Sequence, residues 1–332
     1  MITHRKWHDE VWVERYGHVC PAAPGRIVTI HGIGERDAYN PALFESATTK
    51  ILAFRCELRK SSVRHLSVYH PSIMFARPES NGAWQVDPKI EPFDMLEDPF
   101  IFYIEEDGMQ KVVMGGVRIR DQHGTIIPQT EYYKGDSLRT LDRVSFAVVH
   151  TMKDVRLMQL PDKRFLVCRR PKGDKYKRGR ITMHIIDSLE QLVDIDKLKL
   201  RTLAVLDSGQ EALDWVGVND MQIVKDHEGR AWIGLLGHVA LESNHQLHYA
   251  ASTYKISLEK LMDLEEHSIV PKVIATRACF EDGPYKNDEI KDIVFPGHLE
   301  HVEDYTYRLW TGLSDTRVGS IEIDDPFGLR AV

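Results

Sequence analysis

Short apolar runs separated by polar turns are the main pattern along this chain. Examples are RIVTIHGI (26–33), KILAFRCEL (50–58) and AWIGLLGHVA (231–240), with Gly, Asp, Asn and Pro between the runs. Such runs are typical of β-strands joined by turns. Helical periodicity is scarce: residues 254–267 form the best candidate helix, and part of this stretch fits a connecting turn equally well. The pattern therefore predicts an all-β fold.

The strand pattern repeats. An Asn or Asp opens an apolar run at YNPALF, EDPFIF, KDVRLM, NDMQIV and KDIVFP, so that the leading polar residues are Asn40, Asp98, Asp154, Asp220 and Asp292. Their spacings are 58, 56, 66 and 72 residues. A second strand follows in each unit: KILAFRCE, KVVMGGVR, RFLVCRRP, AWIGLLGH and YRLWTGLSD. A further strand is predicted in three units: RHLSVYHPS, RITMHIIDS and VGSIEID.

Units of this length are typical of propeller blades, which stack around an axis because one blade alone cannot bury both faces. We therefore predict a single five-bladed β-propeller domain over residues 1–332, with blades beginning near residues 39, 97, 153, 219 and 291. The segment RIVTIHGI is expected to close the ring by adding a strand to a terminal blade. The leading polar residues would then open into a central funnel. The alternative is that they only cap turns, as Asp and Asn commonly do.

Composition narrows the classes of function. The chain has 332 residues, 42% of them hydrophobic, and a formal net charge of −7. This mild acidity argues against a nucleic-acid partner, and no apolar run is long enough to span a membrane. The N-terminus lacks the pattern of a signal peptide. The four cysteines have no zinc-site spacing, and we expect reduced, buried thiols in a cytoplasmic protein: Cys20, Cys56, Cys168 and Cys279.

The order of these motifs resembles glycoside hydrolase family 130, the mannoside phosphorylases and related mannosidases. The resemblance covers about residues 36–325 and includes the segment 254–285 before the last unit. It implies a five-bladed propeller that acts on a mannoside or a related glycoside. It also implies that Asp98 is the general acid and that Lys153, Arg170 and His238 bind phosphate. Phe100 stands where the family has Arg, so the sugar specificity of the family does not carry over directly.

Glycoside cleavage requires an acid for the leaving oxygen and a nucleophile for the anomeric carbon. Carboxylates crowded in one funnel raise the pKa of one another, so that one of them holds a proton near neutral pH. Hydrolysis with inversion would need a second carboxylate as base, for which Asp154 and Asp220 are candidates. Phosphorolysis would instead need cations for inorganic phosphate as co-substrate.

Further residues complete the predicted binding site. The sugar-binding candidates are Asn40, Arg55, Glu97, Asp292 and Asp315. Cations at the ends of the second strands are Arg55, Arg118, Arg169, Arg170 and His238. Because successive strand residues face opposite ways, only one of Arg169 and Arg170 can enter the funnel, and the resemblance favours Arg170. The basic stretch 169–180 is either an exposed hairpin or a lid that attracts phosphate.

Aromatic side chains are candidate platforms for sugar stacking: Tyr39, Phe100, Trp215 and Tyr305. His31, in TIHGIGERD, belongs to no metal-binding motif, and no cofactor or resident metal is expected. A ring of axial carboxylates holding a single Ca²⁺ is the alternative.

Three functions remain open from the sequence: a glycoside phosphorylase, an inverting glycoside hydrolase, and a carbohydrate-binding propeller without catalysis. The expected partner is a small carbohydrate, with self-association into a homo-oligomer possible. Fold alone does not choose between these functions, because propellers carry many of them.

Overall fold

The computed structural model describes most of the chain. The described residues are Trp12, Tyr16, 23–59, 70–122, 125–150, 152–171, 180–198, 200, 202, 204–206, 215–243, 245–261, 268–269 and 271–330. Within these ranges the chain is almost entirely β, as the hydrophobic pattern predicts. Short 3-10 turns interrupt it at η2 (Leu189–Leu192), η4 (Arg277–Cys279) and η5 (Asp288–Ile290). In the described part of the chain, no helix is long and apolar enough to cross a membrane.

Three sheets are formed by the first three units of the repeat. The first sheet contains β2 (Ile30–His31), β3 (Arg36–Ser46), β4 (Thr49–Leu58), β5 (Ser72–Pro78), β6 (Trp84–Val86) and β7 (Phe93–Asp94). The second contains β8 (Leu96–Glu106), β9 (Met109–Gln122), β10 (Thr125–Gly135) and β11 (Ala147–Val149). The third contains β12 (Arg156–Gln159), β13 (Phe165–Arg169), β14 (Ile181–Ile186), β15 (Ala204–Leu206) and β19 (Ser268–Ile269).

The remaining strands form one larger sheet. It holds β16 (Trp215–Lys225), β17 (Ala231–Ser243), β18 (Gln246–Ser257), β20 (Lys272–Ala275), β21 (Asp292–Glu303), β22 (Thr306–Leu313), β23 (Arg317–Asp324) and β1 (Arg26–Ile27). Two antiparallel runs, β16–β18 and β21–β23, are joined by a short parallel pairing in which His248 lies opposite Asp292. Units four and five of the predicted repeat therefore share hydrogen bonds.

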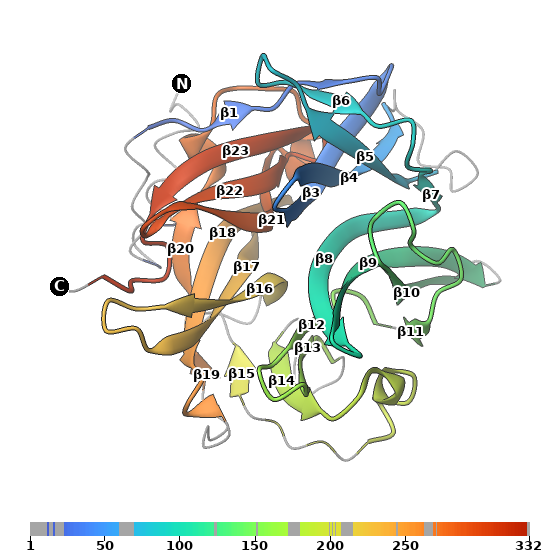
Figure 1. The fold of residues 1–332 in the computed structure, drawn as a ribbon. Coiled ribbons are helices and arrows are strands. Elements are labelled where there is room, and N and C mark those ends of the chain that lie inside the picture. Colours follow the sequence, from blue (N-terminus) through green and yellow to red (C-terminus); the bar gives the residue numbers. More distant parts are fainter. Residues whose placement is uncertain are drawn as a thin grey trace.

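The five repeat units surround a common centre, and their leading strands β3, β8, β12, β16 and β21 are the first strands on its side (Figure 1). These first strands contact one another in a closed circuit, from β3 to β8, β12, β16, β21 and back to β3. This arrangement is propeller-like. It brings the leading strands of the five units together, although the units are far apart in sequence.

Both N-terminal strands contribute to the closure of this circuit. β1 pairs antiparallel with β23, with Arg26 opposite Ser320, and β2 pairs in parallel with β6, with Ile30 opposite Trp84. The segment RIVTIHGI thus links the last antiparallel run to the first sheet. The expectation that it adds strands at the ring closure is confirmed, with two short strands in place of one.

The predicted strands agree with the structure in most units, with two exceptions. Residues 254–257 belong to β18 and are followed by a turn at 258–260, so the candidate helix is wrong where the structure describes it. The segment forms a strand and not a helix because Tyr254 and Ile256 alternate with exposed or half-exposed neighbours along β18. The predicted strand RHLSVYHPS lies mostly outside the described residues.

The apolar core lies between neighbouring sheets. One cluster joins Phe100, Val113 and Tyr132 of the second sheet to Leu157 and Val167 of the third. The described cysteines belong to such clusters as free, buried thiols: Cys56, Cys168 and Cys279. Burial raises the pKa of Cys168 to about 12, so this thiol stays protonated and unreactive at neutral pH. Cys20 lies outside the described residues.

β-Bulges fix the position of the leading polar residues. The pairing of β3 with β4 shifts register between Tyr39 and Pro41, and that of β8 with β9 shifts between Glu97 and Phe100. The residues in these shifts, Asn40 and Asp98, have φ values of 48° and 52°. Asn and Asp adopt this left-handed backbone more readily than other non-glycine residues. A bulge of this kind redirects the side chain at the shifted position.

This geometry corrects the expectation that each leading residue stands at the mouth of its strand. Asp292 is the first residue of β21, and Asp154, with φ of 61°, lies just before β12. Asn40, Asp98 and Asp220 instead lie inside β3, β8 and β16. The prediction was wrong for these three because a strand can continue through a bulge, which hydrophobic periodicity does not reveal.

Candidate active site

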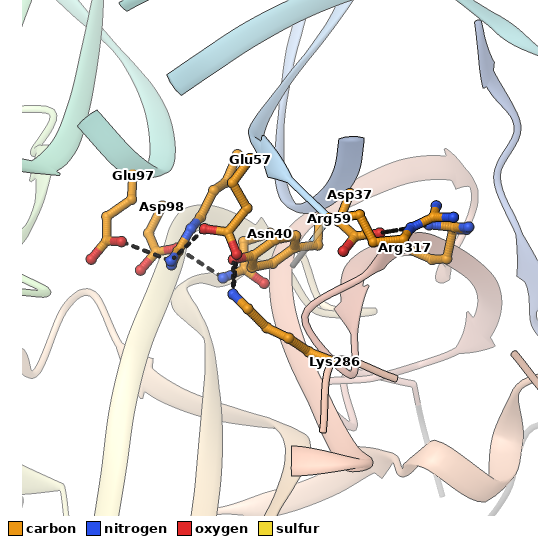
Figure 2. A network of polar contacts seen from close by, with 10 residues as sticks. Asp37, Asn40, Glu57, Arg59, Glu97, Asp98, Lys286 and Arg317 are labelled. Carbon is orange, nitrogen blue, oxygen red and sulfur yellow. Dashed lines mark hydrogen bonds and ion pairs between the residues drawn. The ribbon is translucent and has the colours of Figure 1, made fainter. Parts of the chain in front are cut away.

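Asp98 lies at the centre of a buried polar network that joins the first and second sheets (Figure 2). Its Oδ1 accepts a hydrogen bond from Asn40 Nδ2 at 2.8 Å and one from Arg55 Nη1 at 3.2 Å. Both donors reach the same oxygen. The contacts tie the bulge of β8 to β3 and β4, so that the orientation of the Asp98 carboxyl is fixed by two neighbours from another sheet.

Arg55 contacts three carboxylates at once. Besides Asp98, its Nη2 lies 2.9 Å from Glu97 Oε2 and 3.3 Å from Glu57 Oε2. The Arg55 side chain is only 11% exposed, so these ion pairs are shielded from water. Arg55 and Glu57 point the same way because they are two residues apart on β4.

Lys286 supplies the second cation of this network. Its Nζ forms an ion pair with Glu57 Oε1 and donates to the Tyr39 hydroxyl at 3.3 Å. Burial disfavours the charged form of Glu57, but Arg55 and Lys286 outweigh this and hold its pKa below the ordinary value. Both cations also lie over the Tyr39 ring, at 4.9 Å for Arg55 and 5.4 Å for Lys286.

Asp315 faces the same network from the turn after β22. Burial raises the pKa of its carboxyl, and the charges of Asp98 and Glu57 act in the same direction. Arg55 and Lys286 oppose this rise without cancelling it. The surroundings of Asp315 thus favour a bound proton on its carboxyl.

Asp154, just before β12, lies among cations. Arg170 Nη1 is 3.4 Å from Asp154 Oδ2, and Arg156 Nη2 is 3.9 Å from Asp154 Oδ1. Burial alone would favour a proton on Asp154, but the charges of Arg170, Lys153 and Arg156 reverse this and hold its pKa well below the ordinary range. A carboxylate so stabilised accepts protons poorly, which weakens Asp154 as a general base.

The structure separates Arg169, the last residue of β13, from the adjacent Arg170. Arg170 points toward Asp154, whereas Arg169 forms an ion pair with Asp196 in the turns that follow β14. The alternation of side chains along a strand predicts this divergence. The choice of Arg170 as the inward-facing arginine agrees with this geometry. Residues 172–179, most of the predicted basic lid, lie outside the described residues.

His238 is buried and neutral. Its Nδ1 lies 2.8 Å from Asn219 Oδ1, so the ring donates a proton there and leaves Nε2 as an acceptor. Burial lowers the pKa of His238 to about 3, and Arg170, Lys153 and Arg156 add to the effect while Asp154 opposes it. As a phosphate ligand, His238 would therefore act through an uncharged ring and not as a cation. The ring also stacks on Tyr249, with centroids 5.2 Å apart.

Arg156 was missed by the sequence reasoning and lies at the middle of the centre. It is 2% exposed, its guanidinium is 4.0 Å above the Phe100 ring, and its Nε donates to the Asn219 carbonyl at 3.0 Å. Burial lowers its pKa, while Asp154, Asp98 and Asp220 favour its charge. Three of the five leading residues thus lie within electrostatic reach of one guanidinium.

Two leading residues pair with histidines. Asp220 Oδ2 is 2.7 Å from His298 Nδ1, and although burial opposes a charge on His298, Asp220 raises its pKa above the ordinary value. Asp292 Oδ2 is 2.6 Å from His248 Nδ1, and Asp292 is 2% exposed. Asp292 therefore belongs to a closed contact between β18 and β21 and not to the group around Arg55 and Arg156.

The predicted aromatic platforms are mostly enclosed. Tyr39, Phe100 and Trp215 are buried, and Phe100 packs so closely on Gly115 that a Cβ there would lie 1.9 Å from the ring. Tyr305 lies apart, beneath Arg330 near the end of the chain. Tyr249 is the aromatic residue that sequence reasoning overlooked. Burial raises the pKa of its hydroxyl to about 12, and Arg170, Asp315 and Asp154 all act on it.

Other partners also escaped the sequence reasoning. They are Glu57, Arg156, Asn219, Lys286 and His298. A period-of-two signal was available for Glu57, which follows Arg55 by two residues in a predicted strand, and for Arg156, which follows Asp154 in the same way. Arg118, by contrast, binds Glu131 and Tyr133 within its own sheet. His31, at the end of β2, pairs with Glu79 at 2.9 Å on the surface.

The charges divide the centre into two halves. We call Glu57, Glu97, Asp98 and Asp315, with Arg55 and Lys286, the carboxylate half. We call Lys153, Arg156 and Arg170, with Asp154, the cationic half. The first has four carboxyls for two cations, and the second has three cations for one carboxylate. Among the described residues, no group of three or more His, Cys, Asp or Glu side chains has a geometry suited to a metal ion.

The ring of β-sheets around a polar centre places this chain in the class of propeller-like proteins. Comparisons with known proteins agree with this class. Residues 21–329 match the model of a family described as "Protein of unknown function (DUF1861)". The chain therefore belongs to this family. No curated protein sequence matches the chain.

Solved structures with this fold include proteins that act on mannosides. A mannose phosphorylase from Leishmania mexicana, MPT-4, in complex with phosphate, is 23% identical, with a TM-score of 0.76 over 98% of this chain and 94% of that one. MPT-1, a GDP-Man-dependent mannosyltransferase from the same organism, is 22% identical, with a TM-score of 0.73 over 98% and 94%. A β-1,2-mannobiose phosphorylase from Listeria innocua is 12% identical, with a TM-score of 0.61 over 92% and 93%. The expected resemblance to mannoside phosphorylases of glycoside hydrolase family 130 is confirmed at the level of the fold.

Proposed function

We propose that this protein is a glycoside-active enzyme that cleaves a mannoside or a related glycoside by inverting phosphorolysis, on a five-bladed propeller. The closed circuit of five first strands supports the blade number. The observation that carries the function is the division of the centre. Three cations face one carboxylate in the cationic half, which suits an anionic nucleophile, while the carboxylate half suits a proton donor and sugar hydroxyls.

In this mechanism Asp98 donates a proton to the glycosidic oxygen as the bond from that oxygen to the anomeric carbon breaks. A phosphate oxygen forms the new bond to the anomeric carbon from the opposite face, which inverts its configuration. The products are a sugar 1-phosphate and the released sugar. Lys153, Arg156 and Arg170 would hold the phosphate, and the hydroxyl of Tyr249 would donate to it.

Within the carboxylate half, Asn40 and Arg55 occupy one oxygen of Asp98 and orient the other. Glu97 and Asp315 would accept hydrogen bonds from sugar hydroxyls. Asp315 is also the first alternative as proton donor, because its surroundings raise its pKa.

Hydrolysis by the same acid is the second candidate. It requires a carboxylate that accepts a proton from water. Asp154 is held ionised by three cations and Asp220 is paired with His298, so neither is well prepared as a base. Mannosyl transfer from a nucleotide sugar, the activity in the name of MPT-1, and carbohydrate binding without catalysis are the further alternatives.

Incubation with β-linked mannobioses, with and without inorganic phosphate, separates these functions. A sugar 1-phosphate that forms only with phosphate supports phosphorolysis. Free mannose formed at the same rate without phosphate would replace phosphorolysis by hydrolysis, and binding without turnover would point to a non-catalytic protein. Turnover only with GDP-mannose would indicate a transferase.

The two adjacent arginines offer a matched test of the cationic half. Arg170→Gln removes a cation beside Asp154, so the KM for phosphate should rise by about tenfold or more. Arg169→Gln removes an equal charge one residue away, where the side chain faces Asp196, and should leave that KM nearly unchanged. Equal effects of the two substitutions would contradict the assignment.

Asp98→Asn tests the acid. The variant keeps the shape of the side chain and loses the proton, so turnover of a mannobiose should fall by about 10²–10⁴-fold. A nitrophenyl glycoside, whose leaving group needs little protonation, should be affected much less. Equal losses on both substrates, with the fold intact, would assign Asp98 to sugar orientation and make Asp315→Asn the next variant to measure.

A further inference from the structure

A second group of arginines lies beside the N-terminal strands, outside the two halves of the centre. Arg36, Arg59 and Arg317 line a cavity of about 260 Å³. The other walls of the cavity come from residues 27–30, 33 and 34 and from two buried residues, Ala38 and Val318. None of the residues that we assigned to the carboxylate or cationic half lines it.

The charges around this cavity are not balanced. Asp37 Oδ1 accepts from Arg59 Nε at 3.0 Å and from Arg317 Nη1 at 3.2 Å, as Figure 2 shows. Asp37 is 3% exposed, and these two arginines compensate the charge of its buried carboxylate. Within the described chain, neither Arg36 nor the adjacent Glu35 forms an ion pair closer than 4 Å. Arg59 and Arg317 therefore share one carboxylate, and Arg36 adds a third guanidinium that is not paired with it.

The loop above the cavity leaves room for a ligand. Gly34 lines the cavity with φ of +62°, and a Cβ on Gly34 would meet no atom within 4 Å. Gly32, with φ of +87°, shapes the same turn, and the His31–Glu79 pair anchors the start of the loop. A volume of about 260 Å³ is below the range typical of drug-sized ligands, so a small anion fits better than a nucleotide.

We propose that this cavity binds a phosphate group, free or carried on a single sugar, at a site separate from the centre. Guanidinium groups bind phosphate with paired, charge-assisted hydrogen bonds, and Arg serves this role better than Lys. The three guanidinium groups exceed the charge of Asp37 by two, and that of Asp37 and Glu35 together by one, and this excess supplies the attraction. The inference does not depend on the proposed phosphorolysis, because it uses none of the same residues.

Calorimetric titration with inorganic phosphate and, separately, with a hexose 1-phosphate tests the proposal. The Arg170→Gln variant serves as background because it weakens binding in the cationic half. A binding event that persists in this background is expected. Equal affinity for both ligands would mean that the phosphate group alone is recognised. Tighter binding of the hexose 1-phosphate would indicate that the cavity also contacts the sugar. Absence of binding by both ligands would overturn the proposal.

Two substitutions with opposite expected effects locate the site. Arg36→Gln removes a cation that has no ion pair, so the fold should be kept while affinity for phosphate falls by about tenfold. Asp37→Asn removes the competing carboxylate, so affinity should rise, with a melting curve to confirm folding. Arg164→Gln, in a distant exposed turn beside Asp162, is the control and should change nothing. Unchanged affinity in Arg36→Gln would refute the assignment.

Discussion

Substitution of Arg55 by Gln should reveal how strongly the carboxylate half depends on one cation. Arg55 lies 2.9–3.3 Å from oxygens of Glu97, Asp98 and Glu57, and its side chain is 11% exposed. Removing one partner of a buried ion pair typically costs about 3–5 kcal/mol. Lys286 remains beside Glu57 and Asn40 remains beside Asp98. We therefore expect the lower end of that range, about 3 kcal/mol at pH 7.

The loss of stability in Arg55→Gln should depend on pH. In the native protein, Arg55 and Lys286 lower the pKa of Glu57. Glu57 therefore contributes stability that is present above its unfolded pKa of about 4.3 and is lost as the pH falls through the lowered folded pKa. Without Arg55 the buried carboxylates bind protons more readily in the folded state than in the unfolded state. The stability difference between variant and wild type should therefore shrink from pH 7 to pH 5.

Urea unfolding followed by circular dichroism measures both effects. The double variant Arg55→Gln/Asp98→Asn should recover part of the lost free energy, because one uncompensated charge is removed. Arg164→Gln, which removes the exposed pair with Asp162, serves as the control. A loss below about 1 kcal/mol, the size typical of an exposed pair, would refute the reasoning. A loss that stays constant between pH 5 and pH 7 would refute it as well.

Three other outcomes follow from the structure. The pKa of Asp315 is raised in the folded protein, so its contribution to stability falls as the pH rises above its unfolded pKa. Asp315→Asn should therefore stabilise the protein at pH 7 and lose this advantage near pH 4, as measured by urea unfolding. Gly115→Ala places a Cβ 1.9 Å from the Phe100 ring and should lower stability by about 1–3 kcal/mol, with an unchanged melting temperature counting against it. In NMR titrations, His298 should change charge above pH 6.5, while His238 should stay neutral from pH 5 to 8. A titration midpoint for His238 near 6.5 would contradict the lowering of its pKa by burial.

The strand pattern was predictable because it depends on local alternation and turn residues. Runs such as 50–58 and 231–240 coincide with β4 and β17 almost residue for residue. The bulges were not predictable, because a register shift depends on the partner strand. In the fourth unit the pairing of β16 with β17 shifts between Val218 and Asp220, so Asn219, and not Asp220, bonds with His238.

The partners of the candidate site are harder to predict than its leading residues. Asp98 and Arg55 follow from a repeated position, which a single sequence can reveal. Lys286 reaches Glu57 from a position 229 residues further along the chain, and no local pattern announces such a contact. Arg156 follows Asp154 by two residues, but its central place appears only when β8 and β16 pack beside β12. Contacts between residues of different sheets thus cannot be predicted from local patterns in the sequence.

The pairing of β1 with β23 has a consequence for how the molecule folds. Arg26 contacts Ser320 across 294 residues of chain, so the circuit of sheets closes only after almost the whole polypeptide has been synthesised. Contacts of such long sequence separation slow folding, because the entropy of closing the loop is lost before the contact forms. During synthesis, the edges of the first and last sheets stay open to pairing with other chains. Refolding yield should therefore fall with protein concentration more steeply than the stability of the finished ring would suggest.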